Sequence, residues 1–379
     1  MKDILFIFGT RPEAVKLAPV ILALRERGGA FRAVVCNTEQ QKEMSNQALA
    51  CFGLEADLRL DVMRRNQTLH QLQARLLERL DGIFAERDVA AAVVQGDTMS
   101  VFCGALAAFY RRRPVFHVEA GLRSRDLAEP FPEEALRCMV SRIANLHFAP
   151  TSANRDHLLA EGIAPEIIHV TGNTVVDAMR RLSPDTASAA AAFFRKRGVG
   201  RDGRPTALAT VHRRENHGER LDRILAAIDL LALSHPELDF VIPVHPNPNV
   251  KERVHAALAP QNNVFALPPL GYAELVHLLR GSRLILTDSG GIQEEANSLG
   301  RRILVLRYKT ERMEGVLAGL SELVGADTRR IVERAEALLS SDAGADAGSA
   351  AMELYGDGRA GERIVDLIER YPYPGASGS

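Results

Sequence analysis

Short apolar segments alternate with longer amphipathic segments along most of the chain. The apolar segments lack the strict alternation of a strand with one wet face, so they predict parallel strands buried on both faces. The segments between them, such as 68–86 and 221–233, have the spacing of helices with one apolar stripe. The ten expected strands are 4–8, 33–37, 91–95, 114–118, 147–149, 206–211, 239–244, 263–267, 283–287 and 303–306.

The strands and helices form two series, which predicts an α/β fold with two Rossmann-like domains. We expect a first domain over 1–172, a second over 173–363, and a C-terminal helix and tail over 364–379 that packs back on the first domain. A chain of 379 residues is long enough for two cores. The composition of 342–351 predicts a surface loop or weak helix, and that of 371–379 a frayed end.

Composition narrows the class of protein. The formal net charge of −1 argues against nucleic acid or an anionic membrane as a partner. The apolar segment 4–8 is too short for a signal peptide or a membrane span, so we expect a cytoplasmic protein. The four cysteines lack metal-ligand spacing, which predicts reduced thiols and no metal site.

The first predicted strand runs into a cationic helix start. Thr10 and Glu13 have the spacing of a capping box, which explains them structurally. Arg11 opposes the helix dipole unless an anion shares the site, so Arg11 and Lys16 are candidate phosphate contacts; solvated charges are the alternative. The segment lacks the G-x-G-x-x-G pattern, so no dinucleotide is expected.

Two carboxylates of the first series follow predicted strands, and a third begins a predicted helix. Asp97 comes after 91–95 and could cap the next helix or act in a site. Glu119 shares a face with His117, and either an ion pair with Arg123 or a catalytic role would account for it. Glu133 opens a helix, where dipole compensation alone would explain it. Together the three acids indicate acid–base catalysis.

The second series carries groups suited to anions. His212 and Arg213 follow 206–211, a composition typical of an anion site. Ser289-Gly290-Gly291 open a helix after 283–287, where backbone N–H groups and the helix dipole favour phosphate. Glu295, one turn later, can reach the vicinal hydroxyls of a ribose. The G-x-S-x-G elbow is absent, so Ser289 is not expected to be a hydrolase nucleophile.

An ordered set of motifs resembles the non-hydrolysing UDP-N-acetylglucosamine (UDP-GlcNAc) 2-epimerase family: FGTRPEAVKLAP, QGDT, HVEAGLR, PEE, GNTVVDA, HRREN, PVHPNPNV, LTDSGGIQEEA, TER and YGDG. The resemblance implies a fold of the GT-B type, with parallel sheets facing a central cleft and UDP bound there. It implies a homodimeric isomerase without cofactor that interconverts UDP-GlcNAc and UDP-N-acetylmannosamine. The reaction would eliminate UDP, pass through a glycal, add UDP back and supply a precursor of surface polysaccharide. A GT-B glycosyltransferase and a regulatory UDP-sugar-binding protein are the alternatives.

The resemblance also implies roles for individual residues. The motifs place the catalytic groups at Asp97, Glu119, Glu133 and His212. They place substrate or UDP contacts at Arg11, Lys16, Ser289, Gly290, Gly291, Glu295 and Arg312.

Two loops depart from the family pattern. Gln40-Gln41-Lys42 stand where many relatives have Gln-His-Arg, and Arg65-Asn66-Gln67 stand where Pro-Gly-Gln is common. In bacterial members these loops belong to a second UDP-GlcNAc site that activates the enzyme, and His245 fits that site. The departures predict that activation by substrate is weakened in this chain.

Overall fold

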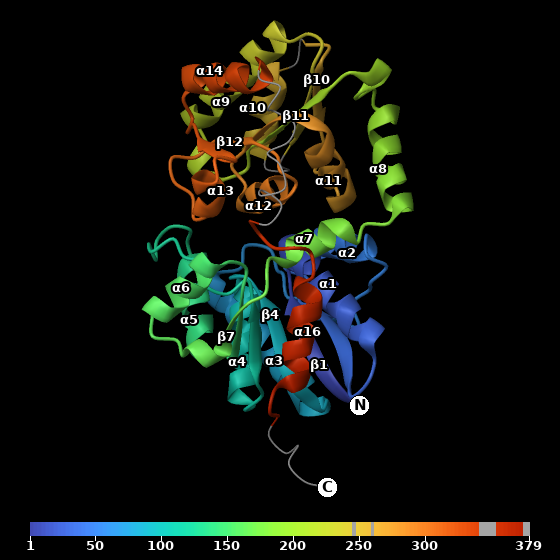
Figure 1. Cartoon of the computed structure of the whole chain (residues 1–379), viewed down its shortest axis with the longest axis vertical. Coiled ribbons are helices and arrows are strands. Elements are labelled where there is room, and N and C mark those ends of the chain that lie inside the picture. The colour runs from blue at the N-terminus through green and yellow to red at the C-terminus, as the bar shows by residue number, and fades with distance from the viewer. Residues whose placement is uncertain (245–247, 259–260, 341–353, 374–379) are drawn as a thin grey trace. The chain divides into compact units, whose positions relative to one another are not determined.

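The computed structural model describes residues 1–244, 248–258, 261–340 and 354–373. Contacts divide the chain into unit 1, which is Met1–Arg181 with Tyr355–Ser379, and unit 2, which is Leu182–Leu354 (Figure 1). The division therefore falls nine residues after the expected end of the first domain at 172, and 355–363 lie in unit 1. The predictions for 342–351 and for the end of the tail at 374–379 concern segments outside the described residues.

Unit 1 contains a parallel sheet with strand order β3-β2-β1-β4-β5-β6-β7. Its strands are β1 (Lys2–Phe8), β2 (Phe31–Asn37), β3 (Leu58–Arg59), β4 (Val89–Gln95), β5 (Val115–Val118), β6 (Leu146–Ala149) and β7 (Ile168–Val170). The chain order runs in one direction from β1 and in the other from β4. This reversal creates a switch point, where doubly wound sheets bind ligands beyond the strands' carboxyl ends.

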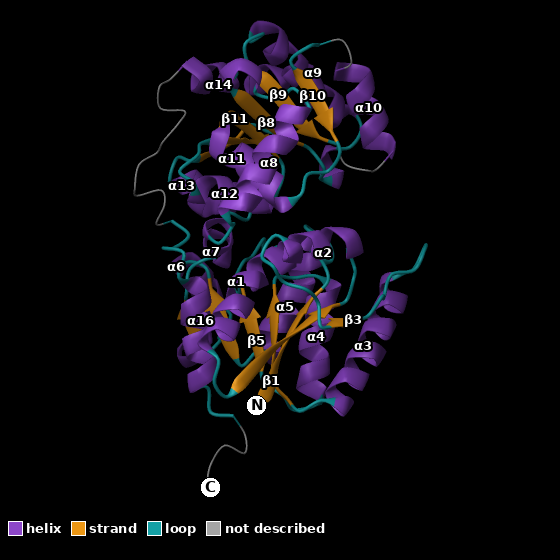
Figure 2. Cartoon of the chain, turned by 90° about the vertical axis from the view of Figure 1, so that its right-hand side faces the viewer, coloured by secondary structure: helices purple, strands orange, loops and turns teal. Residues whose placement is uncertain are grey.

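Helices cover both faces of this sheet (Figure 2). They are α1 (Arg11–Arg27), α2 (Lys42–Ala50), α3 (Leu69–Glu86), α4 (Met99–Tyr110), α5 (Glu133–Ile143), α6 (Ser152–Ala160), α7 (Thr174–Arg180) and α16 (Ala360–Arg370). Leu72, Leu76, Leu80 and Ile83 recur at helical spacing along α3 and are all buried in the core. The capping box predicted for Thr10 and Glu13 is present at the start of α1.

Helix α16, the last helix in the described part of the chain, belongs to unit 1 together with the N-terminal residues. α16 packs on α1 and α7, and it buries Ile364, Val365 and Ile368. Gly361 lies against the backbone of Pro19, where a Cβ would come within 3.0 Å of the carbonyl oxygen. The Gly361 N–H also donates to Asp177 Oδ1 over 2.8 Å.

Unit 2 contains a parallel sheet with strand order β10-β9-β8-β11-β12-β13. Its strands are β8 (Thr206–Thr210), β9 (Asp239–Pro243), β10 (Val264–Leu267), β11 (Ser282–Thr287), β12 (Ile303–Val305) and β13 (Ser321–Leu323). Its helices are α8 (Pro184–Lys196), α9 (Glu219–Ser234), α10 (Pro248–Leu258), α11 (Tyr272–Gly281), α12 (Gly290–Ser298), α13 (Met313–Leu317) and α14 (Thr328–Ser340). The switch point lies between β8 and β11.

Alternate residues of the unit 2 strands enter different cores. Phe240 and Ile242 join one buried cluster, whereas Val241 between them joins another. The same division separates Ala207 from Leu208 in β8. Both faces of the sheet are therefore buried, which is the reason for the continuous apolar runs in the sequence.

The expected α/β class and the two parallel, Rossmann-like sheets are confirmed. Each of the ten predicted strands overlaps an observed one, and β3, β7 and β13 were not predicted. In the part of the chain that the structure describes, no helix is both long and apolar enough to cross a bilayer.

Candidate functional site

The loop after β1 is held by the first turn of α1. Glu13 Oε2 accepts the N–H groups of Gly9 over 2.7 Å and of Thr10 over 3.0 Å. A Cβ at Gly9 would overlap the hydroxyl groups of Thr38 and Ser100, so the close approach of these loops requires glycine. Arg11, the predicted phosphate contact, is the first residue of α1 and is partly exposed at this loop.

Glu119 follows β5 at the carboxyl edge of the unit 1 sheet. Its φ of +62° is unusual for a residue with a side chain, and strained backbone of this kind is enriched at functional sites. Lys16 Nζ lies 2.6 Å from Glu119 Oε1, and Gln95 Nε2 donates to Oε2. Lys16 was expected to contact phosphate; in the structure its ammonium group is bound to a carboxylate.

Arg123 was a possible ion-pair partner of Glu119, but it is directed elsewhere. Its Nε and Nη2 atoms lie 2.6 and 3.0 Å from the Glu161 carboxylate oxygens. Lys16, and not Arg123, is therefore the cation that pairs with Glu119. Because Glu119 and Lys16 are both buried, each charge compensates the other where water cannot.

Asp97 follows β4 and is fixed by a residue of α5. Arg137 directs Nε, over 3.1 Å, and Nη2 to the same oxygen, Asp97 Oδ2. Arg137 Nη1 donates to Glu134 Oε2 over 2.9 Å. Glu133, the predicted catalytic residue, is the first residue of α5 and is half-buried. Its neighbour Glu134 is the acid that joins the Asp97 network.

Burial shifts the pKa of two groups beside Asp97. Burial raises the pKa of Glu13 to about 7, and the negative charge of Asp97 adds to this effect, while the nearby Thr98 hydroxyl and the N–H groups of Gly9 and Thr10 oppose it. Burial lowers the pKa of His117 to about 4, although the carbonyl oxygen of Gly96 opposes this shift. His117 is thus neutral near pH 7, and its Nε2 lies 2.8 Å from the Gly96 oxygen.

In unit 2, a buried carboxylate organises the loop after β8. Asp288, directly after β11, accepts the backbone N–H groups of His212 over 3.0 Å and of Arg213 over 2.9 Å. The Asn216 side chain donates to the same carboxylate over 3.0 Å. His212 Nδ1 lies 3.4 Å from Asp288 Oδ1, and its side chain remains 38% exposed. The imidazole is therefore positioned by its backbone and accessible to a ligand.

The N-terminus of α12 lies beside a guanidinium group. Ser289 is the N-cap, and a Cβ at Gly290 would overlap the guanidinium group of Arg312. Arg312 Nε lies 3.0 Å from Glu294 Oε1, and its Nη1 pairs with Glu311. A cation at the positive end of a helix dipole is unfavourable unless anions share the site. The two glutamates hold Arg312 there, next to backbone N–H groups suited to phosphate.

Other predicted contacts lie on the same elements. Glu295 is buried in the second turn of α12. Burial tends to raise the pKa of Glu311, but Arg312 and Arg307 outweigh it and hold that pKa well below its usual range. The buried Nε atom of Arg213 has no hydrogen-bond partner within the described residues. The arrangement supplies several positive groups for a polyanionic ligand.

The loop between β2 and α2 contains two of the candidate activator-site residues. Gln41 Oε1 accepts the backbone N–H of Arg11 over 3.2 Å, so Gln41 connects this loop to the start of α1. Gln40 Oε1 accepts the Ser100 hydroxyl over 2.9 Å. A ligand that moved this loop would therefore act directly on the loop after β1.

Three further candidates for that site are less closely linked. Lys42 Nζ lies 3.2 Å from the buried carboxylate of Glu39. Gln67 Oε1 accepts from Arg75 Nη1 over 2.7 Å, at the entry to α3. His245 lies outside the described residues.

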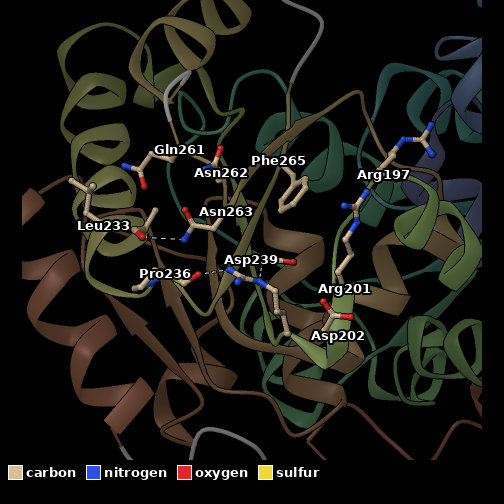
Figure 3. A pocket seen from close by; sticks show the side chains of 13 residues that line it. Arg197, Arg201, Asp202, Leu233, Pro236, Asp239, Gln261, Asn262, Asn263 and Phe265 are labelled. Atoms are coloured by element: carbon tan, nitrogen blue, oxygen red, sulfur yellow. Dashed lines mark hydrogen bonds and ion pairs between the residues drawn. The ribbon is translucent and has the colours of Figure 1, made fainter.

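A pocket of about 610 Å³ lies at the opposite edge of the unit 2 sheet, where β8, β9 and β10 begin (Figure 3). Several of its polar groups are bound within unit 2. Asp239 accepts Arg204 Nε over 2.7 Å, and Asn263 Nδ2 donates to carbonyl oxygens at the end of α9. Because the strands' amino ends form this pocket, the predicted site residues lie elsewhere.

Sequence reasoning missed four residues that fix the predicted ones. They are Gln95, Glu134, Arg137 and Asp288. The i,i+3 spacing of Glu134 and Arg137 on a predicted helix was a usable signal for an ion pair. In the part of the chain that the structure describes, no group of three or more His, Cys, Asp and Glu side chains is placed to hold a metal ion.

Comparisons with known proteins match nearly the whole chain. A family model described as UDP-N-acetylglucosamine 2-epimerase matches residues 23–369. The UDP-N-acetylglucosamine 2-epimerase of Escherichia coli (strain K12) is 43% identical over 97% of this chain and 98% of its own. The crystal structure of the Neisseria meningitidis UDP-GlcNAc 2-epimerase bound to UDP-GlcNAc has 39% identity and a TM-score of 0.88, and the match covers 97% of this chain and 100% of that one. The Methanocaldococcus jannaschii enzyme in complex with UDP-GlcNAc and UDP has 32% identity and a TM-score of 0.82, over 98% and 100% of the two chains. The chain belongs to the UDP-N-acetylglucosamine 2-epimerase family, whose members are isomerases.

Proposed function

We propose that this protein interconverts UDP-GlcNAc and UDP-N-acetylmannosamine by inverting C2 of the sugar. The observation that carries the proposal is a pair of carboxylates, Asp97 and Glu119, which end adjacent strands beside the switch point and are each bound by a buried cation. The relatives from Neisseria meningitidis and Methanocaldococcus jannaschii, which bind UDP-GlcNAc, support this choice of substrate.

The reaction begins with removal of the proton on C2. The electron pair of that C–H bond forms a double bond between C1 and C2, while the bond from C1 to the diphosphate oxygen breaks and UDP leaves with its electron pair. The product of this step is a glycal. An oxygen of UDP then attacks C1, and a proton is delivered to the opposite face of C2, which gives the epimer without net oxidation.

The C2 proton is weakly acidic, so stabilisation of departing UDP must drive the first step. In this proposal His212, Arg312 and the backbone N–H groups at Ser289-Gly290-Gly291 bind the diphosphate as its charge increases. Arg213 and Arg11 contribute further positive charge. Glu295 binds the ribose hydroxyls, which makes unit 2 the UDP-binding domain.

Inversion requires proton handling on both faces of the sugar ring, so at least two groups share the task. Asp97, Glu119 and Glu133 are the proposed acids and bases. Lys16 would orient Glu119 and compensate its negative charge, because the ammonium group lies 2.6 Å from the carboxylate. In this proposal Lys16 does not contact the phosphate directly while its ammonium group is bound to Glu119. A direct contact would require that ion pair to break.

One NMR experiment tests the proposal. UDP-GlcNAc is incubated with the protein in D2O, without any sugar acceptor. Deuterium should appear at C2, and UDP-N-acetylmannosamine should accumulate to a fixed ratio. A glycosyltransferase would leave the substrate unchanged until an acceptor was added, and a UDP-sugar-binding regulator would leave it unchanged throughout. Either result would contradict the proposal.

The wider setting is proposed on the same basis. We infer that the enzyme acts as a homodimer in the cytoplasm and supplies a precursor of surface polysaccharide. Light scattering of the purified protein at low and high concentration tests the dimer. Loss of polysaccharide labelling in cells that lack the gene, restored by the wild type but not by His212→Asn, tests the precursor role.

A further inference from the structure

We propose that Arg137 is a positioning residue that fixes Asp97 for proton transfer, and that Glu134 anchors Arg137 in that role. The inference rests on the proposed function, since it concerns the carboxylate assigned there to acid–base chemistry. Arg137 places Nε and Nη2 on one oxygen of Asp97 and Nη1 on Glu134. All three contacts are made by one planar guanidinium group, so the direction of the Asp97 carboxylate is set by the plane of that group.

The geometry leaves part of Asp97 accessible. Both contacts from Arg137 are to Oδ2, while Oδ1 is outside that pair of bonds. The Asp97 side chain is 25% exposed, whereas that of Arg137 is 5% exposed. A partly exposed carboxylate that is anchored through one of its two oxygens can exchange a proton with a ligand without losing its position.

Glu134 connects this pair to the neighbouring loop. Its Oε2 accepts the backbone N–H of Ser124 over 3.0 Å, and its Oε1 accepts that of Arg125 over 2.9 Å. Those residues lie in the segment that follows β5, which begins with Glu119. The first two turns of α5 therefore hold the loop after β4, through Arg137, and the loop after β5, through Glu134. Two of the proposed proton-transfer groups lie in these loops.

Stability alone does not explain the arrangement. Removing two carboxylates and a guanidinium group from water is costly, and a well-packed apolar cluster of similar volume is often as stable as a buried ion pair. The side chain of Glu134 is only 1% exposed, so its charge is almost fully desolvated. The buried guanidinium group of Arg137 instead holds a partly exposed aspartate in one orientation, as a group that transfers protons requires.

The test uses Arg137→Lys, which keeps the charge but loses the fork. We expect kcat for epimerisation in the D2O assay to fall by about 10- to 100-fold, as expected when a reacting group is misplaced by about 1 Å. We expect KM to change by less than about threefold, because Asp97 would act on the transition state more than on binding. Glu134→Gln should give a smaller fall of the same kind.

Arg87 offers a matched control at the amino ends of the strands of the same sheet. Its Nε and Nη2 atoms both contact Asp3 Oδ2 over 3.0 Å, the same two-to-one geometry that Arg137 uses. Arg87→Lys should leave kcat within about twofold of wild type. Thermal unfolding of both variants reports whether either has lost the native fold.

Chemical rescue separates positioning from folding. Arg137→Ala removes the group and leaves space, so millimolar guanidinium should restore part of kcat to that variant, and an equal concentration of sodium chloride should not. Rescue should be absent in Asp97→Asn, which lacks the group to be positioned. The inference is overturned if Arg137→Lys and Arg87→Lys have equal kcat, or if guanidinium has no effect on folded Arg137→Ala. An inactive wild type would instead contradict the proposed function.

Discussion

Replacing Glu13 by Gln should make the stability of the protein less dependent on pH. Glu13 is buried at the start of α1, and burial raises its pKa from the ordinary value of 4.5 to about 7. Between these two pH values the folded chain holds a proton that the unfolded chain has released. The stabilising contribution is therefore complete below about pH 4.5 and is lost as the pH rises through about 7.

The structure sets the size of the effect. A difference of one pKa unit is worth about 1.4 kcal/mol, so the wild type should lose about 2–3 kcal/mol of stability from this group between about pH 5 and pH 8.5. Gln cannot ionise, and its oxygen can still accept the N–H groups of Gly9 and Thr10 that Glu13 Oε2 accepts. Its amide group would lie near the buried Thr98 hydroxyl, which has no hydrogen-bond partner within the described residues. The free energy of unfolding of Glu13→Gln should therefore rise relative to that of the wild type by about 2–3 kcal/mol between about pH 5 and pH 8.5.

Urea unfolding of both proteins at the two pH values measures the effect, because other titrating groups cancel in the difference. The same substitution at Glu26, near the end of α1, is the matched control. A hydrogen bond from Arg181 lowers the pKa of Glu26, so Glu26→Gln should not gain on the wild type at high pH. A Glu13→Gln difference that is the same at both pH values would show that Glu13 is ionised throughout and would refute the reasoning.

Three further predictions concern turnover. Asp97→Asn, Glu119→Gln and Glu133→Gln should each lower kcat by at least about 100-fold with a smaller change in KM, measured by deuterium incorporation at C2; near-normal kcat in all three would show that the acids are misassigned. His212→Asn should raise the barrier by about 2–4 kcal/mol and change affinity for UDP less, as steady-state kinetics and calorimetry with UDP would show; a loss of affinity alone would make His212 a binding residue. The reverse reaction should start from UDP-N-acetylmannosamine without a lag or added UDP-GlcNAc, because Lys42 cannot bind phosphate bidentately; initial rates that depend strictly on traces of UDP-GlcNAc would contradict weakened activation.

The three strands that sequence patterns did not predict share a position in the fold. β3, β7 and β13 each form an edge of their sheet, and each has only two or three residues. An edge strand is covered on fewer sides, so its residues need not be apolar; in β7 only Ile168 is buried. Nine of the ten predicted strands are interior strands, where burial on both faces demands uninterrupted apolar residues. The tenth, β10, is an edge strand whose residues are nevertheless apolar.

For the candidate site, sequence patterns predicted which residues lie at the ends of strands, but they did not predict which side chains form ion pairs there. The switch-point rule placed Asp97 and Glu119 correctly at the carboxyl edge, because chain order largely determines which loops lie there. It did not show that Lys16 rather than Arg123 lies beside Glu119, since both are cations close to that edge. Side-chain pairing depends on the backbone path through each loop, such as the positive φ of Glu119, and residue spacing does not encode that path.

The placement of α16 with α1 has a consequence for synthesis of the chain. On the ribosome, 182–354 emerge as one continuous stretch, so unit 2 has its whole sequence available before unit 1 does. Unit 1 must wait for Ala360–Arg370, while the surface of α1 and α7 that this helix will cover stays open to water. A nascent chain stalled before residue 360 should therefore present that apolar surface to chaperones. Unit 1, whose first residues leave the ribosome before those of unit 2, is therefore completed after unit 2.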